Sequence, residues 1–144
     1  MRHGVIIMNQ EGKNKNIVRR FYKELYNRKN IGVIDELLSE DYIRHSVFRM
    51  AKGRRGFKNF FVEFYTTSPK ITHSVKCILA EKDKVVVRFT LSFINKKEFM
   101  GIPPTGKKLE MTGIAIFRIA NGRIVEYWDE IDRLGLMRQA GMIP

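Results

Sequence analysis

Cysteine and long hydrophobic runs are scarce in this chain, and each scarcity excludes a class of protein. Of 144 residues only Cys77 is a cysteine, so the chain has neither an internal disulfide nor a thiolate-rich metal centre. A lone thiol is typical of a reducing compartment, and we expect a cytoplasmic protein. We expect Cys77, which stands in a strand-like stretch, to be a buried structural residue. The apolar segments are too short and too often interrupted by charge to span a membrane.

The N-terminus lacks the long apolar segment and the small-residue cleavage site of a secretory signal. We interpret residues 1–12 as a flexible leader, with Met8 as an alternative natural start. Residues 13–144 then form a single domain, because a chain of this length has no room for a second independent core.

Acidic residues are also few, 15 against 27 basic ones, which gives a formal net charge of +12. Such an excess suits nucleic acid, an anionic membrane or an acidic ligand. The basic residues are scattered, however, and no helix-turn-helix or zinc-finger signature accompanies them. We therefore interpret them as a solvated surface and keep nucleic-acid or anionic-membrane binding as the minority alternative.

The first half of the chain has helical periodicity. Apolar side chains recur at helical spacing between Asn14 and Lys29, and again in a short segment from Val33 to Leu38. A third helix is expected to begin near Gly56 and to end before Pro69. Its aromatic face should pack in the core and in part line a pocket: Phe57, Phe60, Phe61, Phe64 and Tyr65.

From Lys70 onward the apolar period changes to two, which indicates strands over 71–80, 84–93, 107–119 and from 122 onward. Short connections such as Asn121–Gly122 favour antiparallel pairing. The sequence therefore predicts an α+β fold, with three N-terminal helices packed into a long, curved, mostly antiparallel sheet. Strands of this length bend, so we expect a cone with an open end.

The last predicted strand carries four carboxylates in an otherwise basic protein: Glu126, Asp129, Glu130 and Asp132. In a regular strand Trp128 shares a face with Glu126, Glu130 and Asp132, whereas Tyr127 shares the other face with Asp129. A carboxylate in a dry pocket has a raised pKa and is suited to general acid/base chemistry. A surface charge paired with a nearby arginine is the alternative for each acid.

Three motifs are more specific than the periodicity. They are Gly-Ile-Pro-Pro-Thr-Gly at 101–106, Gly-Arg-Ile-Val-Glu-x-Trp at 122–128, and Asp-Tyr-x-x-His at 41–45. Together they resemble the SnoaL-like polyketide cyclases and predicted ester cyclases, from Asn14 to the C-terminus. The resemblance implies a cystatin-like α+β cone, the fold of nuclear transport factor two and ketosteroid isomerase. It also implies a homodimer formed through the exposed face of the sheet.

The same resemblance implies a cofactor-independent cyclase or isomerase that acts on a hydrophobic carbonyl-containing small molecule. Cyclases of this kind close a ring by intramolecular aldol condensation, with a pocket aspartate as general acid/base. The resemblance favours Asp132 for that role, Asp129 is the alternative, and His45 would assist. The residues expected to contact the substrate are Tyr42, Phe60, Phe64, Asn95, Glu126 and Trp128.

Asn95 departs from the family pattern, because many relatives have a histidine there and asparagine does not titrate near neutrality. A non-catalytic ligand-binding or interaction module on the same fold is therefore the second hypothesis. No metal is expected, since no group of His, Cys, Asp and Glu has ligand spacing.

Overall fold

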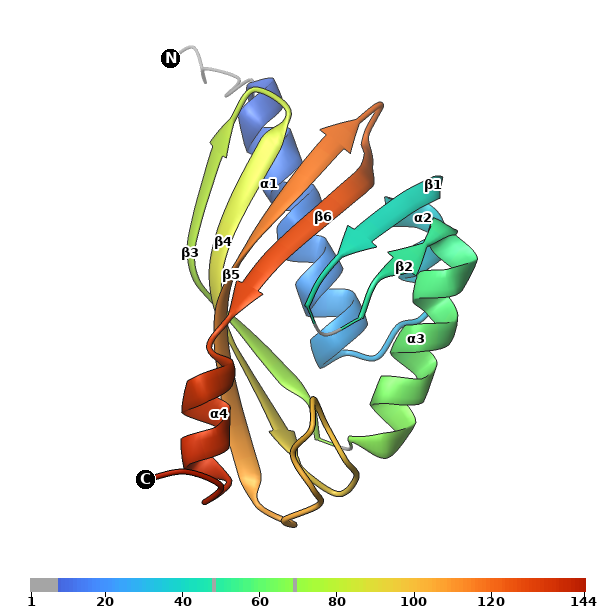
Figure 1. The fold of residues 1–144 in the computed structure, drawn as a ribbon. Coiled ribbons are helices and arrows are strands. Elements are labelled where there is room, and N and C mark those ends of the chain that lie inside the picture. The colour runs from blue at the N-terminus through green and yellow to red at the C-terminus, as the bar shows by residue number, and fades with distance from the viewer. Residues whose placement is uncertain (1–7, 48, 69) are drawn as a thin grey trace, which may run out of the picture.

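The protein is described by a computed structural model that covers residues 8–47, 49–68 and 70–144. Six strands form one sheet in the order β2-β1-β6-β5-β4-β3 (Figure 1). The pairing of β1 with β6 is parallel, and the other four pairings are antiparallel. The prediction of an α+β fold with a mostly antiparallel sheet is confirmed.

The four strands predicted from the period of two are all present, and two more precede them. The strands are β1 (Leu38–His45), β2 (Ala51–Lys52), β3 (Thr72–Glu81), β4 (Lys84–Ile94), β5 (Lys108–Ala120) and β6 (Arg123–Ile131). β1 covers a segment to which the apolar periodicity assigned no element. It forms because Tyr42 and Arg44 alternate toward the interior while the backbone pairs with β6.

The helices are α1 (Gln10–Arg20), η1 (Phe21–Asn27), α2 (Val33–Leu37), α3 (Gly53–Thr67) and α4 (Arg133–Gln139). α1 begins earlier than predicted because the side chain of Asn9 accepts the backbone N–H of Gly12 at 2.8 Å, which caps the helix. Residues 10–12, which were predicted to belong to a flexible leader, are therefore helical, and residues 1–7 of that predicted leader lie outside the described part of the chain.

Helix η1 continues α1 as a π-helix, whose wider turn changes which side chains reach the interior. Phe21, Tyr22, Leu25 and Tyr26 are all buried. Two tyrosines one turn apart thus point into the cone from the same short element. The sequence predicted one regular amphipathic helix from Asn14 to Lys29, and the apolar periodicity did not indicate that its second half is a π-helix.

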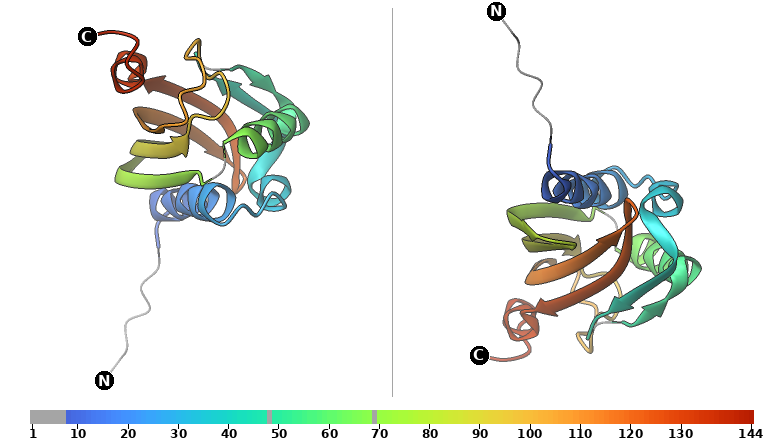
Figure 2. Two further views of the ribbon diagram at one scale, coloured as in Figure 1. Left: turned by 90° about the horizontal axis from the view of Figure 1, so that it is seen from below. Right: turned by 90° about the horizontal axis from the view of Figure 1, so that it is seen from above.

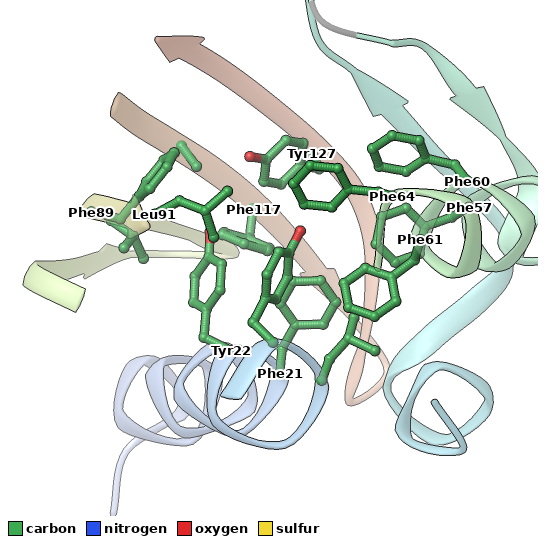
Figure 3. Packing of buried hydrophobic residues seen from close by; sticks show 14 of the residues in the cluster. Phe21, Tyr22, Phe57, Phe60, Phe61, Phe64, Phe89, Leu91, Phe117 and Tyr127 are labelled. Carbon is green, nitrogen blue, oxygen red and sulfur yellow. The ribbon is translucent and has the colours of Figure 1, made fainter. Parts of the chain in front are cut away.

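The long strands curve around the helices, so that α1, η1 and α3 cover the concave side of the sheet (Figures 1 and 2). The interior is mainly aromatic, and rings from η1, α3, β4, β5 and β6 meet there (Figure 3). At Gly113 on β5 an added Cβ would lie 2.7 Å from the carbonyl oxygen of Glu130 and 2.9 Å from the ring of Phe89. Only glycine permits the close approach of β5 and β6 at this position.

Cys77 is exposed, which corrects the prediction that it is buried. The reason is a bulge in β3 between Val75 and Cys77. His73 and Val75 face the interior before the bulge, and Ile78 and Ala80 are the more buried residues after it. One extra residue reverses the alternation of the strand and turns Cys77 outward.

Candidate functional site

A buried ion pair joins β1 to β6 inside the cone. Nη2 of Arg44 lies 3.3 Å from Oδ2 of Asp129, and the two side chains are 6% and 3% exposed. The hydroxyl of Tyr127, which faces the same way as Asp129 on β6, donates to the same carboxylate oxygen at 2.8 Å. The alternation of β6 thus directs Asp129 inward, as the face assignment from the sequence required.

Arg44 is surrounded by rings as well as by the carboxylate. Its guanidinium carbon lies 4.4 Å from the ring centre of Tyr127 and 5.3 Å from that of Phe60, within the range of cation–π attraction. Burial by itself lowers the pKa of Arg44, but the neighbouring tyrosines, Tyr127 first, and Asp129 together hold that pKa above its usual value. Arg44 therefore remains a cation in a dry environment.

Several buried polar atoms in this interior have no hydrogen-bond partner among the residues that the structure describes. They include Oδ1 of Asp129, Nε of Arg44, the hydroxyl of Tyr22 and both ring nitrogens of His73. Most buried polar groups in proteins are paired, because leaving one unpaired costs free energy. A cluster of five such atoms makes this the part of the interior where a water molecule or the polar group of a ligand would find hydrogen-bond partners.

These atoms surround a small cavity whose walls are otherwise apolar. Its lining residues are Tyr22, Tyr26, Arg44, Phe60, Phe64, His73, Phe89, Leu91, Phe99, Met111, Tyr127 and Asp129. We call this space the inner chamber. Phe60 and Phe64, predicted as substrate walls, lie on it, and their rings converge with Tyr127 in Figure 3. The chamber measures about 20 Å³, close to the space of one water molecule, so a larger ligand requires side chains to move.

Asp132, the acid favoured by the resemblance, does not reach the inner chamber. It is exposed, and its Oδ1 accepts the backbone N–H of Gly135 at 2.8 Å as the N-cap of α4. β6 ends at Ile131, so Asp132 belongs to the start of the helix rather than to a strand face. The expectation that Asp132 points into the pocket is therefore corrected in favour of Asp129.

His45, Glu126 and Trp128 lie together on the opposite face of the sheet. Nε2 of His45 is 2.7 Å from Oε2 of Glu126, and the ring of Trp128 stacks on the imidazole with centres 5.4 Å apart. The hydrogen bond from His45, and after it Arg118, lowers the pKa of Glu126. These three residues, which the sequence analysis predicted at the substrate site, do not line the inner chamber.

The outer face of the sheet carries an open groove of about 670 Å³, which we call the outer groove. His45 and Trp128 form part of it, together with Ser46, Val47, Met50, Lys84, Ile116, Asp129 and Glu130. Its walls are mostly apolar, and Val47, Met50 and Ile116 are exposed. The groove is far larger than the inner chamber, and Asp129 contributes to the lining of both.

Tyr42 and Asn95 are buried but do not line the inner chamber. The Tyr42 ring packs edge-on against Phe57 with centres 5.3 Å apart, deeper in the core. Asn95 accepts the backbone N–H of Thr105 at 2.9 Å and donates to the carbonyl of Lys97 at 2.9 Å. Asn95 therefore closes the base of the loop at 96–107 instead of orienting a substrate.

Sequence reasoning missed Arg44 and His73. The signal for Arg44 was available, because Tyr42 and Arg44 share one face of a strand and His45 the other. No residue near His73 in the sequence indicates a partner for it, and its burial among Tyr22, Tyr26 and Phe89 depends on how η1 packs on the sheet.

Within 8–47, 49–68 and 70–144, no three His, Cys, Asp or Glu side chains are close enough to hold a metal ion. No helix in the same ranges is long and apolar enough to cross a membrane.

Comparison with known proteins places these features in context. The family model for SnoaL-like polyketide cyclases matches residues 16–140. Among solved structures, TsrD from Streptomyces laurentii is 26% identical with a TM-score of 0.82, over 95% of this chain and all of that one (100%). The putative polyketide cyclase IdmH from Streptomyces antibioticus is 27% identical with a TM-score of 0.76, over 89% of this chain and 98% of that one.

A putative SnoaL-like polyketide cyclase from Jannaschia sp. CCS1 has a TM-score of 0.82 over 98% of this chain and 100% of that one, and at 22% identity it supports the fold alone. No curated protein is similar enough to count as a match.

Proposed function

Because the chain belongs to the SnoaL-like polyketide cyclase family, we propose that it is a cofactor-independent enzyme in which Asp129 acts as general acid/base on a hydrophobic carbonyl compound. The observation that carries the proposal is the unpaired Oδ1 of Asp129 in a chamber lined by aromatic rings. A carboxylate oxygen that is dry and unpaired is available to accept a proton from a ligand in the same space.

The proposed reaction begins with transfer of a proton from a carbon next to the carbonyl to Oδ1 of Asp129. The electron pair of the broken C–H bond forms an enolate, so the negative charge passes from the carboxylate to the substrate oxygen. Arg44 lies beside Asp129 on the same chamber, so its cation would offset the charge of the carboxylate and then that of an enolate bound there. The enclosed site makes this compensation stronger than it would be in water.

Ring closure follows from the same arrangement. The enolate carbon attacks a second carbonyl of the same molecule, which forms a C–C bond and leaves an alkoxide. The protonated Asp129 then returns its proton to that oxygen and is again a carboxylate. Enclosing the flexible substrate between rings would favour the folded conformer that this step requires.

Access to Asp129 would require the chamber to open, and the loop at 96–107 is the element that we propose moves. This loop places the buried side chain of Phe99 against Phe64 and Phe93, with ring centres 5.7 and 4.7 Å apart. Phe99 is also a wall of the inner chamber. Displacement of one aromatic side chain would enlarge the chamber without breaking the sheet.

Exchange of carbon-bound hydrogen tests the proposal without knowledge of the natural substrate. β-Tetralone is an apolar bicyclic ketone with acidic protons next to its carbonyl, and their replacement in deuterated buffer can be followed by proton NMR. We expect the wild-type protein to accelerate exchange and Asp129→Asn to lose about 100-fold or more of that acceleration. Exchange no faster than in buffer, or unchanged in Asp129→Asn, would contradict the proposal.

A second candidate, a non-catalytic module that binds a small hydrophobic ligand, is favoured by one observation. Asp129 is already paired with Arg44 and Tyr127, an arrangement that also serves to hold a structural charge in place. This alternative predicts ligand binding without hydrogen exchange, and Asp129→Asn would then leave affinity for β-tetralone nearly unchanged.

We further propose that the active protein is a homodimer joined through the outer face of the sheet. Support comes from exposed apolar side chains on the outer groove and the adjacent strands, among them Leu79 at 62%, Ile114 at 50% and Met50 at 54% exposure. Contiguous apolar patches of this kind on a soluble domain often mark an interface. Glu130 and Lys84 lie on the same groove, so a second copy would offer complementary charges.

A further inference from the structure

His73 is held in a fixed position on β3 by the side chain of Asn27. The backbone N–H of His73 donates to Oδ1 of Asn27 at 2.7 Å, and its carbonyl accepts from Nδ2 of the same residue at 3.0 Å. This pair of hydrogen bonds joins the strand to η1. It fixes the backbone from which the imidazole projects into the inner chamber.

The imidazole ring is fixed by stacking as well. Tyr22 lies parallel to it, with ring centres 3.5 Å apart and planes 11° apart. Phe89 packs beside it at 5.0 Å, and Tyr26 contacts it at 5.3 Å. Since its neighbours are rings, the imidazole can form hydrogen bonds only through the nitrogens on its edge, and both lack a partner among the described residues.

Burial determines which form of this imidazole is present. His73 is 7% exposed, and desolvation lowers its pKa to about 3. The ring is therefore neutral at physiological pH, with one nitrogen as an N–H donor and the other as an acceptor. The charged groups on the chamber, Arg44 and Asp129, compensate each other in a direct ion pair. Tyr22 and Tyr26, which contact the imidazole, are neutral phenols whose pKa is raised by burial.

We propose that His73 is a further catalytic residue of this chamber, the neutral donor that binds the carbonyl oxygen of the substrate while Asp129 removes the adjacent proton. This inference rests on the proposed function. The two residues enter one chamber from different strands, β3 and β6, so a carbonyl group between them could reach both. A neutral donor strengthens its hydrogen bond as the oxygen becomes an enolate, without first requiring a second buried cation.

The inference also defines the ligand. The chamber should prefer an apolar molecule with an acceptor-only oxygen over the same molecule without oxygen, because a hydrocarbon leaves the His73 donor unpaired. β-Tetralone and tetralin are such a pair, since they share the bicyclic skeleton and differ at the carbonyl.

Binding and infrared spectroscopy of this pair test the role of His73. In wild type we expect the carbonyl stretch of bound β-tetralone to lie below its value in hexane, as for a hydrogen-bonded ketone. His73→Phe retains a stacking ring but has no N–H, so the stretch should return to the hexane value. The ratio of β-tetralone affinity to tetralin affinity should fall about tenfold, while tetralin binding itself changes little.

Two further variants separate the imidazole from its surroundings. His73→Gln restores a neutral N–H donor at the chamber edge and should recover part of the carbonyl shift. Tyr22→Phe keeps the stacked ring and removes only the hydroxyl, so it should retain the shift. Loss of the shift in Tyr22→Phe together with its persistence in His73→Phe would overturn the assignment of His73.

The outcome for His73 is distinguishable from the outcome for Asp129. If His73→Phe keeps both the shift and the affinity ratio while Asp129→Asn abolishes hydrogen exchange, the role of His73 is wrong and the proposed function stands. If wild type binds neither compound up to its solubility, both proposals fall, because the chamber is then closed to apolar ligands.

Discussion

Arg44 and Asp129 face each other across two parallel strands, with Nη2 and Oδ2 at 3.3 Å and almost no exposure to solvent. The distance is longer than the roughly 2.7–2.9 Å typical of a charge-assisted hydrogen bond. Oδ2 of Asp129 also accepts a hydrogen bond from the hydroxyl of Tyr127. Oδ1 has no hydrogen-bond partner among the residues that the structure describes. The proposed role of Asp129 rests on this incomplete pairing.

Removal of either charge should destabilise the protein. Arg44→Met leaves Asp129 buried beside apolar rings, and we expect the free energy of unfolding to fall by about 3 kcal/mol. Asp129→Leu should likewise destabilise the protein, because it leaves Arg44 buried without its carboxylate. In the double variant Arg44→Met/Asp129→Leu the free energy of unfolding should fall by clearly less than the sum of the two single losses, since no unpaired charge remains. Urea unfolding measures all three. Additive losses would mean that the two side chains do not interact.

The exposed pair on the outer face offers a control for that experiment. Arg118 lies 3.1 Å from Glu126, with side chains 37% and 22% exposed. Arg118→Met should change stability by less than about 1 kcal/mol, because water and salt screen such a pair.

The buried His73 makes stability depend on pH. In the unfolded chain His73 takes up a proton near the ordinary histidine pKa of about 6.5. In the folded protein its pKa is about 3, so the imidazole stays neutral until the pH approaches that value. The unfolded state thus binds more protons in this window, and stability falls as the pH decreases through it. Between pH 7 and pH 5 the protonation of His73 in the unfolded chain should by itself lower the free energy of unfolding by about 2 kcal/mol.

The matched variant for this prediction is His73→Gln, which keeps a neutral polar side chain and cannot titrate in this range. Chemical denaturation at a series of pH values should show a shallower acid-side slope in the variant than in wild type. Equal slopes would show that the imidazole is protonated in the folded protein as readily as in the unfolded chain.

Asp132 should behave as a helix cap and nothing more. Asp132→Ala removes the acceptor for the N–H of Gly135, and we expect a loss of about 1 kcal/mol in thermal or chemical unfolding. Asp132→Asn should lose less, because an asparagine oxygen can accept the same bond. A larger effect of either variant on β-tetralone binding than on stability would assign Asp132 to the ligand site instead.

The sequence predicted the fold better than the site, and the strands explain why. Alternating apolar residues identified β3 to β6 and placed Tyr127 with Asp129 on one face, since a regular strand has a fixed side-chain period. The prediction from this alternation was wrong at two positions where the strand is not regular. The bulge in β3 turned Cys77 outward, and the end of β6 at Ile131 removed Asp132 from the strand.

The rest of the site depends on contacts between segments that are distant in the sequence. Arg44 and Asp129 are 85 residues apart, and Asn27 and His73 are 46 apart. No local pattern indicates that these pairs meet, or that the aromatic face of α3 leaves so small a chamber. Asn95 was predicted to contact the substrate because it aligns with a position of the family motif. In the structure its side chain instead accepts a hydrogen bond from Thr105 and closes a loop.

The outer face of the sheet gives a prediction about assembly. Ile116→Glu places a charge in the middle of the apolar outer groove, and we expect it to convert a dimer into a monomer in light-scattering or sedimentation measurements. Lys70→Gln, at an exposed position in the turn before β3, is a control with the same change of one charge unit. A wild-type protein that is monomeric at all concentrations would contradict the dimer proposal.

Asp129 and Asp132 are three residues apart, and the proposed mechanism requires that Asp129 exchanges protons with a ligand and Asp132 does not. The direct measurement is hydrogen–deuterium exchange of β-tetralone by wild type, Asp129→Asn and Asp132→Asn under one set of conditions. We expect Asp132→Asn to match wild type and Asp129→Asn to lose about 100-fold or more. Equal rates for wild type and Asp129→Asn, or a loss confined to Asp132→Asn, would contradict the central claim.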